Sequence, residues 1–146
     1  MSMTWFRPLI SLFAMMGLAI SAYAQTPSPS AMPPVQTQGN VTYVSGGIGS
    51  DEQHALRAAR PNFNLHLLFH EPGGAYLAKI DVVIMDDSGA KVLDAFSNGP
   101  YFMAKLQPGR YRISVDDGRG RPQTRQVTVP ARGAASASFS WGKAQS

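Results

Sequence analysis

Cysteine is missing from the 146-residue sequence, which excludes disulfides, thiolate zinc sites and cysteine nucleophiles. Charge is scarce at the N-terminal end, where Arg7 is the only charged residue before position 51. No apolar run reaches the roughly 20 residues that a membrane-spanning helix needs. The length fits one domain, and without disulfides that domain depends on its hydrophobic core for stability.

The N-terminal region has the three parts of an export signal. Arg7 is followed by an apolar run over residues 9–20 and by the small-residue pattern Ala22-Tyr23-Ala24, which is the arrangement of a secretory signal peptide and its cleavage site. We therefore predict a signal peptide at residues 1–24 and a periplasmic or secreted mature protein. Cleavage would leave no integral membrane segment, and export argues against nucleic acid as a partner.

Two short segments flank the predicted domain. Residues 25–40 contain four prolines and neither a charged nor an aromatic side chain. Such a composition cannot bury enough apolar surface to offset its ordering entropy, so we predict a disordered, extended linker. Residues 143–146 are predicted to be a tail, and the domain itself to occupy residues 41–142.

Within residues 41–142, apolar side chains recur at every second position, and turn residues interrupt them about every ten residues. The inward rows are Phe63, Leu65, Leu67 and Phe69; Ala78, Ile80, Val82 and Ile84; Tyr111, Ile113 and Val115; and Ala135, Ala137, Phe139 and Trp141. This pattern is typical of a sandwich of short strands. We predict an all-β, antiparallel, Ig-like or transthyretin-like β-sandwich of seven or eight strands.

One short helix is expected near the N-terminus of the domain, over residues 50–60. Ser50 is predicted as its N-cap, with Gln53 completing a capping box, and Pro61 ends it. The preceding cluster Gly46-Gly47-x-Gly49 could hold an anion at the helix N-terminus. It lacks the lysine and hydroxyl residues of a phosphate-binding loop, so a plain strand-to-helix turn is favoured.

The sharpest local motif is Pro108-Gly109-x-Tyr111. Pro108 and Gly109 suit the two central positions of a type II turn, because proline fixes φ at the first and glycine supplies a positive φ at the second. Tyr111 is predicted to anchor this structural turn as a tyrosine corner does, through a hydrogen bond from its hydroxyl to the backbone.

Three features between Tyr76 and Val129 occur together. They are the strand Val82-x-Ile84-x-Asp86 before Gly89, the connection Ser97-Asn98-Gly99-Pro100-Tyr101, and the stretch Leu106-x-Pro108-Gly109-x-Tyr111-x-Ile113-x-Val115. With them the segment resembles a carboxypeptidase regulatory-like domain, a small transthyretin-like sandwich. The resemblance implies a module that binds or supports another component, without catalysis or a cofactor. The hydroxyisourate hydrolases share this architecture but end in Tyr-Arg-Gly-Ser, which does not occur here.

Charge is distributed unevenly along the chain. Residues 25–104 carry four basic and seven acidic side chains, whereas residues 105–146 carry eight basic and two acidic ones. A basic surface attracts anionic partners. Our first hypothesis is therefore a non-catalytic envelope module that docks to an acidic protein or glycan; in the alternative, the arginines only keep the protein soluble and protect its sheet edges. The predicted binding residues are Arg110, Arg112, Arg119, Arg121 and Arg125.

The histidines suggest an alternative of another class, a small hydrolase or metal-binding enzyme that uses His54, His66 and His70. At about 3.3 Å per residue, the Cα atoms of His66 and His70 would lie roughly 13 Å apart on one strand, too far to share a zinc ion unaided. The acidic turns Asp86-Asp87 and Asp116-Asp117 lack the alternating spacing of a calcium loop. We predict no catalytic residue and no metal site; self-association through an edge strand stays open.

Overall fold

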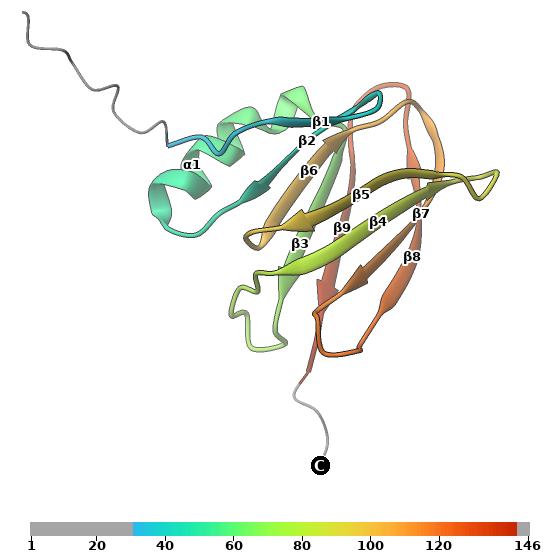
Figure 1. Ribbon diagram of the computed structural model, residues 1–146. Coiled ribbons are helices and arrows are strands. Elements are labelled where there is room, and N and C mark those ends of the chain that lie inside the picture. Colours follow the sequence, from blue (N-terminus) through green and yellow to red (C-terminus); the bar gives the residue numbers. More distant parts are fainter. Residues whose placement is uncertain (1–30, 143–146) are drawn as a thin grey trace, which may run out of the picture.

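Two β-sheets pack face to face in the computed structural model, which describes residues 31–142 (Figure 1). The five-stranded sheet has the order β1-β2-β6-β3-β9 and the four-stranded sheet the order β5-β4-β7-β8. The strands of the first are β1 (Gln36–Gln38), β2 (Val41–Gly46), β3 (Leu65–His70), β6 (Tyr101–Lys105) and β9 (Ala135–Ser140). Those of the second are β4 (Ile80–Asp86), β5 (Lys91–Ser97), β7 (Gly109–Asp116) and β8 (Gln123–Val129). The predicted all-β sandwich is confirmed, while residues 1–24 and 143–146, predicted as signal peptide and tail, lie outside the described residues.

The sandwich differs in its details from the antiparallel one of seven or eight strands that we predicted. Residues 31–142 form nine strands, and β9 runs parallel to β3. The chain crosses from β8 in the four-stranded sheet to β9 in the five-stranded sheet, where β9 lies beside β3 and runs in the same direction. Alternation along a strand reports which side chains are buried but not the direction of its neighbour, so this pairing was not predictable.

The predicted linker 25–40 also ends earlier than expected. Its residues Gln36–Gln38 form β1, which pairs with the start of β2. The turn between the two strands contains only Gly39 and Asn40, and Gly39 has a φ of 57°. Such a left-handed residue permits the tight hairpin, and the prediction of disorder was wrong for this part of the linker.

The core between the sheets is built from the alternating rows that the sequence predicts. Three rows contribute buried side chains at consecutive inward positions, from Leu65 to Phe69, from Ile80 to Ile84, and at Ile113 and Val115. Phe63, predicted in the first of these rows, is buried elsewhere, because it precedes β3 and packs under α1 (Ser50–Ala59). Phe69, Phe139 and Trp141 form an aromatic cluster in this core, with ring centroids 6.0 to 6.4 Å apart. Burial of these side chains is the main stabilising contribution in a chain without disulfides.

Helix α1 (Ser50–Ala59) packs on the outer face of the five-stranded sheet (Figure 1). Its buried residue Leu56 joins a second, smaller apolar cluster with Val44 of β2, Phe63 and Met103 of β6. A short 3-10 turn, η1 (Arg60–Asn62), follows and ends the helix near Pro61, as predicted. None of the helices in residues 31–142 is long and apolar enough to cross a membrane.

The start of α1 corrects the predicted capping box. The N-cap position is Gly49, with a φ of 93° and no side-chain cap, so Ser50 is already helical. Two helix side chains instead hold Gly47: Glu52 accepts a hydrogen bond from its backbone N–H at 2.6 Å, and Gln53 donates to its carbonyl at 2.9 Å. The glycine cluster is thus a strand-to-helix turn fastened by the helix.

Polar side chains cover the backbone groups at both open sides of the sandwich. At one side, the Gln38 amide donates to the carbonyl of Asp94 on β5 at 3.0 Å and accepts from its N–H at 2.7 Å. At the other side, Gln123 and Arg125 of β8 each donate a 2.8 Å hydrogen bond to a carbonyl of β9, those of Ser140 and Ser138. These contacts occupy edge groups that could otherwise pair with a strand of another molecule.

Tyr111 has the predicted tyrosine-corner hydrogen bond, although the turn beside it is not of type II. Gly109 has a φ of 157° and already belongs to β7, whereas a type II turn requires a φ near +80° at this position. The Tyr111 hydroxyl donates to the carbonyl of Gln107 at 2.6 Å. Burial, together with the nearby Asp86 charge, raises the pKa of Tyr111, so the hydroxyl keeps its proton at neutral pH.

Replacement of Tyr111 by phenylalanine should lower the free energy of unfolding by about 1 kcal/mol, because it removes one hydrogen bond and retains the ring. Urea denaturation of the two proteins measures the difference. Equal stability of Tyr111→Phe and the unsubstituted protein would show that the bond to Gln107 makes no net contribution.

Candidate functional site

The five arginines that we predicted as one binding surface are divided between three places. Arg110 and Arg112 lie on β7 and are exposed, whereas Arg119 and Arg121 belong to the β7–β8 connection and Arg125 lies on β8. Arg110 and Arg119 are nine residues apart, and β7 alone spans roughly 20 Å between them at about 3.3 Å per residue. The structure therefore does not bring the five arginines together at one place.

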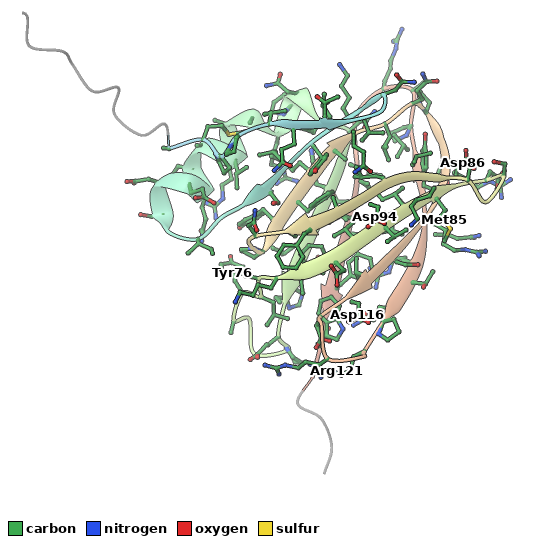
Figure 2. The ribbon with its side chains drawn as sticks, in the orientation of Figure 1. Tyr76, Met85, Asp86, Asp94, Asp116 and Arg121 are labelled. Atoms are coloured by element: carbon green, nitrogen blue, oxygen red, sulfur yellow. The ribbon has the colours of Figure 1, made fainter. Side chains whose placement is uncertain are left out.

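Arg121 holds the C-terminal end of the domain against the β7–β8 connection (Figure 2). Its guanidinium forms an ion pair with Asp117, with 2.8 Å between Nε and the carboxylate, and it also donates to the carbonyl of Gly142. The backbone carbonyl of Arg121 in turn accepts a 2.7 Å hydrogen bond from the Trp141 indole. Burial favours the protonated form of Asp117, but the hydrogen bonds from Arg119 and Arg121 and their charges outweigh it and lower the pKa of Asp117.

Arg125 is likewise used by the fold. It lies directly opposite Ile113, a fully buried residue, and therefore points to the inner side of the sheet. Its guanidinium carbon sits 4.9 Å from the centroid of the Phe139 ring, while the same side chain donates to the Ser138 carbonyl. This cation–π and edge contact is structural. The sequence did contain a signal for this inward orientation, because Arg125 lies two residues before the inward residue Val127 on the same strand.

Arg110 and Arg112 remain as an outward-pointing pair, which we call the β7 arginine pair. Both line a hollow of about 100 Å³ on the outer face of the four-stranded sheet, together with Gln126, Asp86 and Asp87. Among the described residues, neither guanidinium has a carboxylate within 4.0 Å. The pair therefore forms no direct ion pair with the described part of the fold, although two carboxylates line the same hollow.

The acidic turn next to the β7 arginine pair is occupied by its own hydrogen bonds. The Asp86 carboxylate accepts from the Ser88 hydroxyl at 2.6 Å and from the backbone N–H groups of Ser88 and Ala90 at 2.9 and 3.0 Å. These bonds, above all the one from the Ser88 hydroxyl, lower the pKa of Asp86. Asp86 therefore acts as a turn residue, as the sequence analysis favoured.

The outer face of the four-stranded sheet is polarised along its strands. Met85 lies opposite Arg112 at one end of β4, and Asp81 lies opposite Asp116 at the other end. In Figure 2, Met85 and Asp86 accordingly appear at the end of the sheet opposite to Asp116 and Arg121. The Asp81–Asp116 end would therefore repel an anionic partner, whereas the other end combines the β7 arginine pair with the carboxylates of Asp86 and Asp87.

The three histidines are not brought together as a metal site. Residues 31–142 contain no group of three His, Asp or Glu side chains placed to hold a metal ion. His66 Nε2 lies 3.1 Å from the carbonyls of both Arg60 and Phe63, so it must carry the proton, and Nδ1 accepts from the Arg60 guanidinium at 3.3 Å. His70 instead contacts the carbonyl of Glu71 at 2.8 Å.

A second hollow, which we did not predict, lies between α1 and the outer face of the five-stranded sheet. We call it the α1 groove; it measures about 160 Å³ and is lined by Leu56, Arg57, Arg60, Leu68, Tyr101 and Met103 among others. The helical spacing of four residues between Leu56 and Arg60 indicates from the sequence that both lie on one side of the helix. The sequence does not indicate that this side of the helix packs against β3 and β6, so the groove could not be predicted.

Comparison with protein-family models and with curated proteins identified no relative of this sequence. The resemblance to carboxypeptidase regulatory-like domains therefore stays a prediction from the motifs between Tyr76 and Val129.

Proposed function

We propose that this protein is an exported, non-catalytic β-sandwich module of the cell envelope that docks to an anionic partner, an acidic glycan or an acidic protein, through the β7 arginine pair. The observation that carries the proposal is the exposure of Arg110 and Arg112 on one strand face without a carboxylate partner among the described residues. Guanidinium groups are suited to such a role because their planar N–H groups match carboxylates in bidentate fashion.

The use of the other titratable side chains favours binding over catalysis. Asp86 and Asp117 are held by turn hydrogen bonds, and His66 is held between backbone carbonyls and Arg60. A general base needs a free position beside a substrate, whereas these groups stabilise the fold. The β7 arginine pair is different, since its outward charges are available to another molecule.

The double variant Arg110→Glu/Arg112→Glu should bind at least tenfold more weakly to an anionic polymer, because attraction is replaced by repulsion at the contact. Two probes, a soluble polyuronate and polyaspartate, separate a glycan partner from a protein partner. Binding of the unsubstituted protein, measured by fluorescence polarisation, should weaken between low and physiological salt as the charges become screened.

A matched control keeps the same change in net charge and moves it elsewhere. Lys105 on β6 and Arg119 in the β7–β8 connection are both exposed, and the variant Lys105→Glu/Arg119→Glu should retain most of the binding. Equal losses in the two double variants would assign the effect to net charge alone and refute a site on β7. Failure of the unsubstituted protein to bind either polymer would refute the proposal as a whole.

A further inference from the structure

The α1 groove combines an apolar floor with a cationic rim. Met103 on β6 and Leu56 on α1 are almost fully buried at 3 % and 1 % exposure, and Leu68 on β3 is half-buried beside them. Arg57 and Arg60 line the same hollow from the helix side and are exposed. An apolar hollow with a few convergent polar groups is the usual form of a small-molecule site.

The two arginines of the groove have no acidic partner among the described residues, because neither lies within 4.0 Å of a carboxylate there. Arg60 is oriented by its hydrogen bond to the His66 ring at 3.3 Å, which leaves other N–H groups of the guanidinium unused by that bond. The hydrogen bond with the Tyr76 hydroxyl lowers the pKa of Tyr101 against the opposing effect of burial, and the nearby guanidinium groups of Arg57 and Arg60 lower it further. The groove therefore favours negative charge at this rim.

The aromatic wall of the groove is rigidly placed. Tyr101 packs against Tyr76, with ring centroids 5.8 Å apart and the two hydroxyls 3.4 Å apart. Gly47 also approaches this ring closely, because an added Cβ at that position would lie only 2.3 Å from it. Tyr76, labelled in Figure 2, belongs to the β3–β4 connection and supports Tyr101 without lining the groove itself. A fixed ring offers a stacking or edge-to-face contact to a second ring.

We propose that the α1 groove binds a small aromatic carboxylate, with its ring on Leu68 and Met103 beside Tyr101 and its carboxylate on Arg57 and Arg60. The volume of the hollow, about 160 Å³, matches this class, since an apolar cavity of about 150 Å³ accommodates one benzene ring. The site is independent of the β7 arginine pair, because α1 packs on the outer face of one sheet and β7 belongs to the other (Figure 1).

Benzoate and phenylacetate test the proposal directly, in an NMR titration of the purified protein. We expect saturable shifts confined to the amides around the groove, with a dissociation constant at least tenfold lower than that of acetate, which lacks the ring. Hexanoate tests the choice of an aromatic ligand: binding as tight as that of benzoate would overturn it. Equal affinities for acetate and benzoate would overturn the apolar part of the site.

The charge contribution is tested with Arg57→Gln/Arg60→Gln, which removes both guanidinium charges and, at position 60, the hydrogen bond to His66. Binding of benzoate should weaken at least tenfold, whereas weak binding of benzyl alcohol, the neutral analogue, should not change. The single variant Arg57→Gln, which leaves the His66 contact untouched, should show an intermediate loss. Unchanged benzoate binding in the double variant would refute the proposal.

A second control separates this inference from the proposed function. The variant Arg110→Gln/Arg112→Gln should bind benzoate normally while losing affinity for polyuronate or polyaspartate. Loss of benzoate binding in this variant would show that the carboxylate is held on β7 and would overturn the groove assignment, whatever the result with the polymers.

Discussion

Replacement of Phe69 by alanine is expected to lower the free energy of unfolding by about 3–5 kcal/mol. Phe69 is completely buried on β3, and its ring lies 6.0 Å from that of Phe139 and 6.1 Å from that of Trp141. The truncation removes both aromatic contacts and leaves a cavity between the sheets, and each such pair is worth about 0.5–1.5 kcal/mol beyond the buried area. The loss is large for a domain whose total stability is of order 5–15 kcal/mol.

Phe96 provides a control with the same chemical change. It lies on β5 with 45 % of its surface exposed, so Phe96→Ala should change stability by no more than about 0.5 kcal/mol. Urea denaturation measures both variants, and thermal unfolding should show a decrease in Tm on the order of 15 °C for Phe69→Ala alone. Similar losses in the two variants would contradict the placement of Phe69 in the core.

The aromatic cluster also explains how the parallel strand is held. Phe139 lies on β9 and Trp141 directly follows that strand, whereas Phe69 belongs to β3. The cluster therefore joins the two strands of the parallel pair by side chains as well as by their backbone ladder. The milder substitution Phe69→Leu should cost less than about 1.5 kcal/mol, because it retains most of the volume.

The alternating rows made the sandwich predictable, since burial of one strand face requires a period of two. Ile113, Val115 and Leu65 are buried between the sheets as expected, whereas Phe63 is buried in the smaller cluster under α1. Strand partners were not predictable from this pattern, because it describes one strand at a time. The parallel direction of β9 and the pairing of Gln36–Gln38 with β2 depend on contacts between distant parts of the chain.

The candidate site was predicted less well than the fold, for a related reason. Five arginines within sixteen residues suggest one basic surface, but their side chains have different surroundings. Arg121 and Arg125 contact groups far along the chain, the carbonyls of Gly142 and Ser138. A cluster of arginines in the sequence therefore suggests a larger exposed basic surface than the fold has. The reason is that some of the side chains bind backbone carbonyls far along the chain, which the local sequence does not reveal.

Gly99 should be the glycine least tolerant of a side chain. It lies buried in the connection between β5 and β6, where an added Cβ would be 2.3 Å from the carbonyl oxygen and 2.4 Å from the carbonyl carbon of Gly46. These are backbone atoms at the end of β2 and cannot rotate away. The connection is also held by hydrogen bonds, from the Asn98 N–H to Ser45 at 3.1 Å and from Ser97 to the Gly99 carbonyl at 2.7 Å.

Gly99→Ala is therefore expected to destabilise the protein by about 3 kcal/mol, the upper part of the range for overpacking in a closely packed interior. Gly73→Ala is the matched control, because a Cβ at Gly73 would meet no atom within 4 Å. Both substitutions reduce the freedom of the unfolded chain in the same way, so the difference between their urea midpoints isolates the clash with Gly46. If Gly99→Ala unfolds at the same midpoint as Gly73→Ala, the close approach of this connection to β2 is not a constraint on the fold.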